Sequence, residues 1–260
     1  MKGIALPMNA SFDSNDSSNH QHETDDEERN LKSILARQLG VEDGNGSLAG
    51  RIAIDVGMRI IQGELLPGSD LNSVDLASDF NSSRTPVREA LLMLEKQGLV
   101  EVPARRRPVV KDYLNVRVDK IYETRALLTG YMSMSICLNW VGDDLDKLWQ
   151  HVEEMQAASS AGDVNRFFWA NVHFGEDATR IADNQFVAET VDSLGLTSLG
   201  LRRRSMALPG RMEASTRDHV RLHEAFRARD TSLARALSMG IIRDAYFALS
   251  GGKASRWPFD

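Results

Sequence analysis

The chain lacks several features that would define a secreted or membrane-bound protein. Only one of its 260 residues is a cysteine, Cys137, which excludes a disulfide framework and any zinc site built from several thiolates. No run of 18 uncharged apolar residues occurs, and the first 25 residues lack a basic start followed by an apolar segment. These absences predict a soluble, cytoplasmic protein without a membrane-spanning segment.

Aromatic residues are also few, at 7% of the chain, although hydrophobic residues as a whole make up 42%. This composition supplies enough apolar surface for a sizeable core and favours a helical protein over a sandwich or barrel. Negative charge is unevenly distributed. Residues 1–47 hold 4 basic against 9 acidic residues, residues 48–113 hold 9 against 9, and residues 114–260 hold 18 against 19. The net charge of −6 therefore does not exclude a nucleic-acid partner for the middle segment.

The two ends of the chain are expected to be tails. Residues 9–29 are rich in Ser, Asn, Asp, Glu and His, and such a segment cannot bury enough surface to offset the entropy of ordering. We therefore expect residues 1–47 to be an acidic, largely disordered tail with at most one transient helix over residues 30–39. Residues 251–260 are expected to be a C-terminal tail.

Residues 48–113 have the pattern of a winged helix-turn-helix. A first helix stops at Gly63, a second covers residues 73–80, and a third begins at Ser83 or Thr85 and ends before Gly98. Two short β runs follow, on either side of an arginine-containing loop. Three helices and a two-stranded hairpin within this length predict the winged helix-turn-helix fold.

The third helix carries the strongest functional signal. Its apolar residues recur at the spacing of one helical face: Val87, Ala90, Leu91 and Leu94. Arg84 and Arg88 then share the opposite face with Thr85, near a helix start that offers free N–H groups to a phosphate. Two arginines on one face can also bind guanine edges in a major groove. Periodicity alone is equally compatible with an ordinary amphipathic helix whose arginines are solvated.

The hairpin loop contains a basic triplet, Arg105, Arg106 and Arg107. At the tip of a wing these side chains would reach backbone phosphates or a minor groove. An isolated arginine triplet is usually a solvated loop, but this one follows a helix-turn-helix pattern. The two features together favour DNA binding.

Residues 63–100 resemble the amino-terminal domain of GntR-family bacterial transcription regulators. The resemblance rests on Gly63-Glu-Leu-Leu-Pro-Gly68, Leu76-Ala77, Ser83-Arg-Thr-Pro-Val-Arg-Glu-Ala-Leu91 and Leu94-Glu-Lys-Gln-Gly-Leu-Val100. It implies that Ser83, Arg84, Thr85 and Arg88 contact operator bases and phosphates and that the wing tip enters the minor groove. Arg107 stands where a glycine is common in the family, so the turn of the wing can differ.

Residues 114–250 show only helical periodicity, which predicts six or seven antiparallel helices in a bundle. The expected fold class is thus mainly α, with an N-terminal winged helix-turn-helix domain, a small β-hairpin wing and a C-terminal helical bundle. The opening residues, Ile121-Tyr-Glu-Thr-Arg-Ala-Leu-Leu128, resemble the ligand-sensing domain of the FadR subfamily. That resemblance implies an effector cavity and dimerisation within the bundle.

Candidate effector contacts follow from burial and from the resemblance. Arg125 should point into the bundle, where a buried arginine needs an anionic partner, and the resemblance puts it at the cavity, so a carboxylate effector is expected. The resemblance also puts His219 in the cavity, together with Asn171. Trp169 could supply an apolar wall. One arginine of the run 202–204 should point inward, and Arg203 is the candidate although periodicity does not decide between the three.

Many relatives bind a divalent metal through one Asp and three His residues. The alignment implied by the resemblance places Asn171, Gly175 and Ile241 at three of these positions and leaves only His219. Divalent metals need several anionic or imidazole donors, so we predict no metal and no cofactor other than a small organic effector. A different alignment would make His173 or His223 a ligand, although His223 on an apolar stripe favours a hydrogen-bonded core histidine.

The leading hypothesis is a ligand-responsive DNA-binding transcription regulator, a repressor of a catabolic or metabolic operon that binds a palindromic operator as a homodimer. The alternatives are a metal-dependent carboxylate sensor of the same fold, a DNA-binding adaptor that has lost sensing, and an enzyme. An enzyme is disfavoured because the sequence contains no Gly-rich phosphate loop, no Gly-x-Ser-x-Gly elbow and no paired-carboxylate motif.

Overall fold

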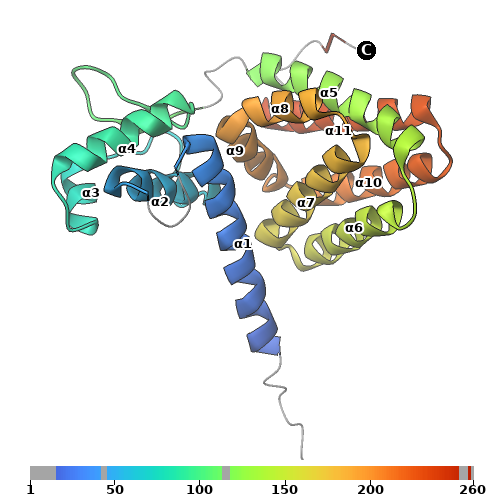
Figure 1. Cartoon of the computed structure of the whole chain (residues 1–260), viewed down its shortest axis with the longest axis horizontal. Coiled ribbons are helices and arrows are strands. Elements are labelled where there is room, and N and C mark those ends of the chain that lie inside the picture. The colour runs from blue at the N-terminus through green and yellow to red at the C-terminus, as the bar shows by residue number, and fades with distance from the viewer. Residues whose placement is uncertain (1–15, 42–45, 113–117, 252–256, 259–260) are drawn as a thin grey trace, which may run out of the picture.

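A computed structural model describes residues 16–41, 46–112, 118–251 and 257–258 of the chain. Within these residues it contains eleven helices and one two-stranded antiparallel sheet. Figure 1 shows α2 to α4 and the hairpin (residues 48–110) on one side, a bundle of later helices on the other, and helix α1 (Asp16–Leu39) running between them. The predicted fold class, mainly α with a small hairpin wing, is confirmed.

The N-terminal domain is built from three helices and the hairpin: α2 (Leu48–Gln62), α3 (Ser73–Asp79), α4 (Arg84–Lys96), β1 (Val100–Glu101) and β2 (Val109–Val110). Helix α2 begins where the Ser47 hydroxyl accepts a hydrogen bond from the Gly50 N–H at 3.1 Å. It ends at Gly63, whose φ of +81° is a left-handed conformation that a glycine adopts without strain. Its apolar face packs against α4.

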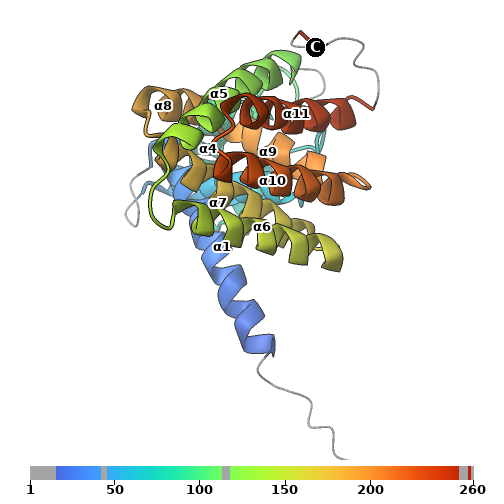
Figure 2. The same cartoon turned by 90° about the vertical axis from the view of Figure 1, so that its right-hand side faces the viewer.

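The C-terminal domain contains seven helices among the described residues: α5 (Val118–Asn139), α6 (Asp144–Ala161), α7 (Val164–Ala182), α8 (Gln185–Ser193), α9 (Gly195–Met206), α10 (Arg211–Arg227) and α11 (Thr231–Leu249). Helix α5 packs against α11 and α7, while α6 packs against α7 and α10, which is visible in Figure 2. Fully buried aromatic side chains fill the interior: Tyr122, Phe167, Phe168 and Phe226. The result is the expected helical bundle.

Helix α1 (Asp16–Leu39) differs from the expectation of a largely disordered tail with a transient helix. Leu31 and Leu35 are both 0% exposed, and Leu35 packs so closely on α2 that a Cβ atom at Gly57 would lie 2.8 Å from its Cδ2. The apolar residues of this helix are covered by α2 and α9, a surface that exists only after the domains have folded. The helix expected over residues 30–39 is thus present, but it begins at Asp16 and is packed on the folded chain rather than transient, while residues 1–15 lie outside the described residues.

The C-terminal segment also differs in part from a free tail. The Trp257 side chain is 5% exposed, with its ring centroid 5.8 Å from that of Tyr246 and 6.3 Å from that of Phe247. Residues 252–256 and 259–260, and the boundary expected at residues 113–114, lie outside the described residues. Among the helices that the structure describes, none combines the length and the apolar character needed to cross a bilayer.

Candidate nucleic-acid interface and ligand cavity

Helix α4 has one buried face and one exposed face. Val87, Ala90, Leu91 and Leu94 are at most 1% exposed and pack into the domain core. Ser83, Arg84, Thr85 and Arg88 are all exposed, and Ser83 is the N-cap residue without a side-chain capping hydrogen bond. The N-terminal end of α4, from its N-cap into its second turn, therefore presents two guanidinium groups, two hydroxyls and free backbone N–H groups to solvent, as a recognition helix requires.

The wing continues this exposed basic surface. Arg105, Arg106 and Arg107 are exposed in the loop between β1 and β2, whose register pairs Val100 with Val110. The Arg107 Nη1 lies 3.5 Å from the Asp70 Oδ2, so this side chain is directed toward the loop before α3 rather than away from the domain. Arg105 and Arg106 lie in the turn itself. Their contacts with DNA stay a prediction.

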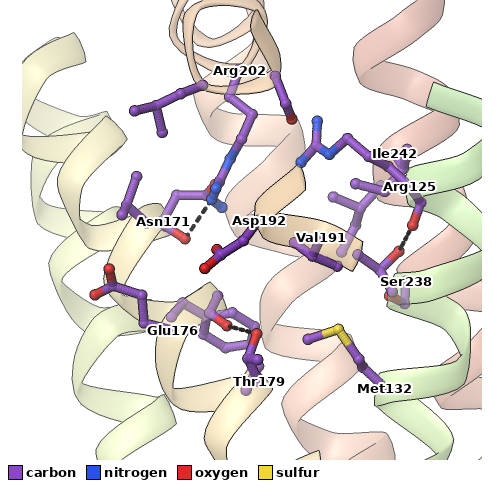
Figure 3. A pocket seen from close by; sticks show the side chains of 18 of the residues that line it. Arg125, Met132, Asn171, Glu176, Thr179, Val191, Asp192, Arg202, Ser238 and Ile242 are labelled. Atoms are coloured by element: carbon purple, nitrogen blue, oxygen red, sulfur yellow. Dashed lines mark hydrogen bonds between the residues drawn. The ribbon is translucent and has the colours of Figure 1, made fainter. Parts of the chain in front are cut away.

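A cavity of about 220 Å³ lies inside the helical bundle. Arg125 from α5, Asn171 from α7 and His219 from α10 line it, as the resemblance implied, and most of the other lining side chains are apolar. Figure 3 shows Arg125 and Asn171 on different helices around this space. Helix α1 contributes Ile34 and Gln38 to the lining. The volume is below the ~300–1,000 Å³ of pockets for drug-sized ligands, so the cavity suits a small molecule.

Two of the expected effector contacts lie elsewhere. The Arg203 Nη1 lies 3.2 Å from the position of a Cβ atom at Gly63, so Arg203 points toward the end of α2 and outside the cavity. Arg202 lines the cavity instead, because consecutive helical residues point about 100° apart. Trp169 is 3% exposed and packs on Phe168 and His173, outside the cavity lining. These placements correct the choice of Arg203 and Trp169.

Three polar side chains form one hydrogen-bonded chain along the cavity wall. The Arg202 Nη2 donates to the Asn171 side-chain oxygen at 2.7 Å and to its backbone oxygen at 2.8 Å, and Figure 3 shows the first of these bonds. The Asn171 Nδ2 lies 3.3 Å from the His219 Nε2. The His219 Nδ1 lies 2.7 Å from the Ser215 backbone oxygen, so Nδ1 carries the proton and Nε2 accepts from Asn171.

Burial dominates the electrostatics of the cavity. It lowers the pKa of His219 to about 4, so this imidazole is neutral at physiological pH. Burial, and then the nearby charge of Arg125, lower the pKa of Arg202 to about 9. Burial also lowers the pKa of Arg125, whose guanidinium carbon lies 5.3 Å from the centroid of the Tyr122 ring. Among the described residues, no acidic side chain forms an ion pair with Arg125 or Arg202.

The cavity does not fit the divalent metal that the family resemblance suggests. Asn171, Gly175, His219 and Ile241 all line it, so the four aligned positions do converge. They offer one imidazole and one amide oxygen, and that oxygen accepts a hydrogen bond from a guanidinium. Among the described residues, no group of three or more His, Cys, Asp or Glu residues could hold a metal ion. The absence of a metal stays a prediction.

The other two histidines considered as ligands lie outside the cavity lining. His173 contacts Asn30 of α1, with 2.7 Å between its Nε2 and the Asn30 Nδ2. His223 is 6% exposed, and its Nε2 lies 3.0 Å from the Leu145 backbone oxygen, as expected of a hydrogen-bonded core histidine. Neither imidazole lies with His219 in one site.

Sequence reasoning missed two contributors to the cavity. Arg202 was indistinguishable from its arginine neighbours because the helix register was unknown. The α1 residues lie outside the region of family resemblance, and the only available signal was their apolar spacing. Helix α1 also closes the side of the cavity near Asp192, where the Arg37 Nη2 lies 3.4 Å from the Asp192 Oδ2.

Comparison with known proteins identifies both domains. The model of the "Bacterial regulatory proteins, gntR family" matches residues 48–110, and that of the "FCD domain" matches residues 120–244. Relatives include the gluconate operon transcriptional repressor of Bacillus subtilis, 29% identical over 53% of this chain and 56% of that protein. The chain thus spans little more than half the length of this relative.

Two further matches agree in fold. The HTH-type transcriptional repressor RspR of Escherichia coli is 25% identical over 64% of this chain and 73% of its own length. The solved structure of E. coli McbR/YncC has a TM-score of 0.64 at 22% identity and covers 81% of this chain and all of its own. At 22% identity, this structural similarity supports only the fold, which includes the two-domain arrangement.

Proposed function

We propose that this protein is a transcriptional repressor whose operator affinity responds to a small molecule. The proposal starts from the family, because the chain belongs to the GntR family and carries an FCD domain of the FadR type. The protein binds a palindromic operator as a homodimer in the cytoplasm. The observation that carries the proposal is the exposed basic N-terminal end of α4 in one domain and a cavity in the other, connected by hydrogen bonds through helix α1.

Helix α1 supplies those contacts. The Gln97 Nε2, at the C-cap of α4, donates to the Gln38 backbone oxygen at 2.6 Å. The Gln38 Nε2 in turn donates at 3.1 Å to the backbone oxygen of Asp192, which lines the cavity. A ligand that moves Asp192 would therefore act on the end of the recognition helix through one intervening residue.

A homodimer is supported by exposed apolar side chains near the junction of α5 and α8: Leu127, Tyr131, Leu138, Val141 and Phe186. Leu138 and Phe186 are 70% and 77% exposed, and the Asn184 Nδ2 donates to the Tyr131 hydroxyl at 3.0 Å, which ties the two helices together. Large exposed apolar side chains on neighbouring elements are typical of protein interfaces. A two-fold dimer would present two α4 helices to successive major grooves.

In vitro selection tests the proposal. The full chain is incubated with random duplex DNA and bound sequences are enriched over several rounds. A palindromic consensus with half-sites about 10 base pairs or a multiple apart is expected. Failure to enrich any sequence, at a salt concentration low enough for phosphate contacts, would contradict the proposal.

A further inference from the structure

We infer that the cavity is a metal-free receptor for a small hydroxylated organic acid, whose carboxylate or phosphate group is held by Arg125 and Arg202. This inference rests on the proposed function, because it names the chemical class of the effector. It departs from a metal-based sensor, since the guanidinium of Arg202 takes the place of the metal as the cation that faces the ligand.

The first argument is the unbalanced charge of the cavity. Arg125 from α5 is 8% exposed, Arg202 from α9 is half-buried, and both line the cavity. One buried and one half-buried cation without an acidic partner among the described residues are costly unless an anion completes the site. The acidic lining residues Glu176 and Asp192 are exposed, and Asp192 is paired with Arg37.

The second argument is that Arg202 is held in place. Both bonds from Nη2 go to Asn171, whose amide is bound on its other side to His219. Within the described part of the chain, both hydrogen bonds of the Arg202 guanidinium come from Nη2, so Nη1 and Nε can donate to a ligand. A planar guanidinium held in this way is suited to a bidentate contact with a carboxylate or phosphate.

Gly175 lies next to the Arg202 guanidinium. A Cβ atom at Gly175 would lie 3.7 Å from the Arg202 Nη2, so a large side chain at this position would meet the guanidinium. The same position is the one where the alignment with metal-binding relatives expects a histidine. A glycine here leaves the guanidinium unobstructed and offers no side chain to a metal.

The third argument concerns hydroxyl groups. Ser133, Ser198 and Ser238 are at most 9% exposed and line the cavity. Each of these side chains brings to the cavity wall a hydroxyl group that can both donate and accept a hydrogen bond. A ligand with several hydroxyl groups would satisfy these three side chains, and a purely aliphatic acid would not. The cavity volume of about 220 Å³ limits such a ligand to a small acid.

A matched set of probes separates the two parts of this recognition. Thermal shift and calorimetric titration are carried out on the full chain, with chelator present, using gluconate, malate, sorbitol, hexanoate and glucose 6-phosphate. At least one hydroxy acid is expected to bind about 10-fold or more tightly than sorbitol, which lacks the charge, and than hexanoate, which lacks the hydroxyls. Comparison of gluconate with glucose 6-phosphate distinguishes a carboxylate from a phosphate.

Variants identify the arginine. Arg202→Gln, which can still donate to Asn171, is expected to weaken acid binding by about 10- to 100-fold, because a hydrogen bond to a charged group is lost. Arg202→Lys keeps the charge and should give an intermediate loss. Arg203→Gln, next to it but outside the cavity, is the matched control and should bind as the natural chain does.

The outcomes are distinguishable. The inference is overturned if no hydroxy acid or sugar phosphate binds while the protein still binds its selected operator, or if binding appears only when zinc, nickel or manganese is added. It is also overturned if Arg203→Gln loses binding and both Arg202 variants keep it. If the protein binds neither an acid nor DNA, the result contradicts both the proposed function and this inference.

Discussion

Arg84 and Arg88 are the side chains on which DNA recognition is expected to depend. Both are exposed on the face of α4 opposite Val87 and Leu91, so neither contributes to the core. Replacement of either by alanine should weaken operator binding by ~1–3 kcal/mol, the cost of a lost base contact, without changing the thermal stability. Fluorescence anisotropy at matched salt measures the affinity.

Lys96 provides the control for these two variants. It is exposed at the last turn of the same helix, about 18 Å along the axis from Arg84 at 1.5 Å per residue. Lys96→Ala should therefore change operator affinity much less than either arginine variant. Unchanged affinity in both arginine variants would show that α4 does not enter the groove with its first turn.

His219 makes the stability of the protein depend on pH. Burial lowers its pKa from 6.5 to about 4 in the folded chain, so the unfolded chain binds the proton first as the pH falls. The folded state is unaffected above pH 6.5 and loses stability between pH 6.5 and 4, by about 2 kcal/mol at pH 5. Urea unfolding at pH 7.5 and pH 5 measures this loss.

The variant His219→Gln distinguishes the contribution of His219 to the pH dependence of stability from the contributions of other titrating groups. A glutamine at this position has no proton to gain, so the variant should lose less stability than the natural chain over the same pH interval. The two chains share every other titratable group, so the difference between their losses belongs to His219. Equal losses would mean that the imidazole is not buried in its neutral form.

At the scale of elements, helix α1 is part of the folded core. Leu35 is fully buried against α2, next to Gly57. Leu35→Ala should lower the free energy of unfolding by ~2–5 kcal/mol, as for other leucines removed from a packed core. Urea unfolding of the full chain measures the change, and Lys32→Ala, exposed on the same helix, should leave the midpoint nearly unchanged. Identical midpoints for all three proteins would mean that α1 is not docked in solution.

At the scale of the whole molecule, the apolar side chains around Leu138 and Phe186 are expected to hold the dimer together. The natural chain should have a mass of twice 28.9 kDa by light scattering at micromolar concentration. Leu138→Glu combined with Phe186→Glu places unpaired charge in an apolar interface, so the variant should be monomeric and bind its operator weakly. Leu66→Glu is the control, since Leu66 is 62% exposed but lies in the N-terminal domain. A monomeric natural chain with intact operator binding would contradict the dimer.

Local sequence patterns determined most of the secondary structure and the face of each helix in the N-terminal domain. The apolar spacing of α4 and the glycines at 63 and 98 are signals within a few residues, and the structure has the helix and its limits where those signals lie. The exposed position of Arg84 and Arg88 follows from the same spacing, because a residue opposite a buried stripe must face solvent.

Only the tertiary structure decided what lies next to the cavity. The choice between Arg202 and Arg203 depends on the rotation of α9 about its axis, and that rotation is set by packing against α7 and α2 rather than by residues within α9. The docking of α1 depends in the same way on a surface formed by α2 and α9, since an isolated segment with so few apolar residues would gain too little from burial to offset the entropy of ordering. In both cases the deciding interactions are contacts between residues far apart in the chain. The spacing of residues within one segment of the sequence does not predict such contacts.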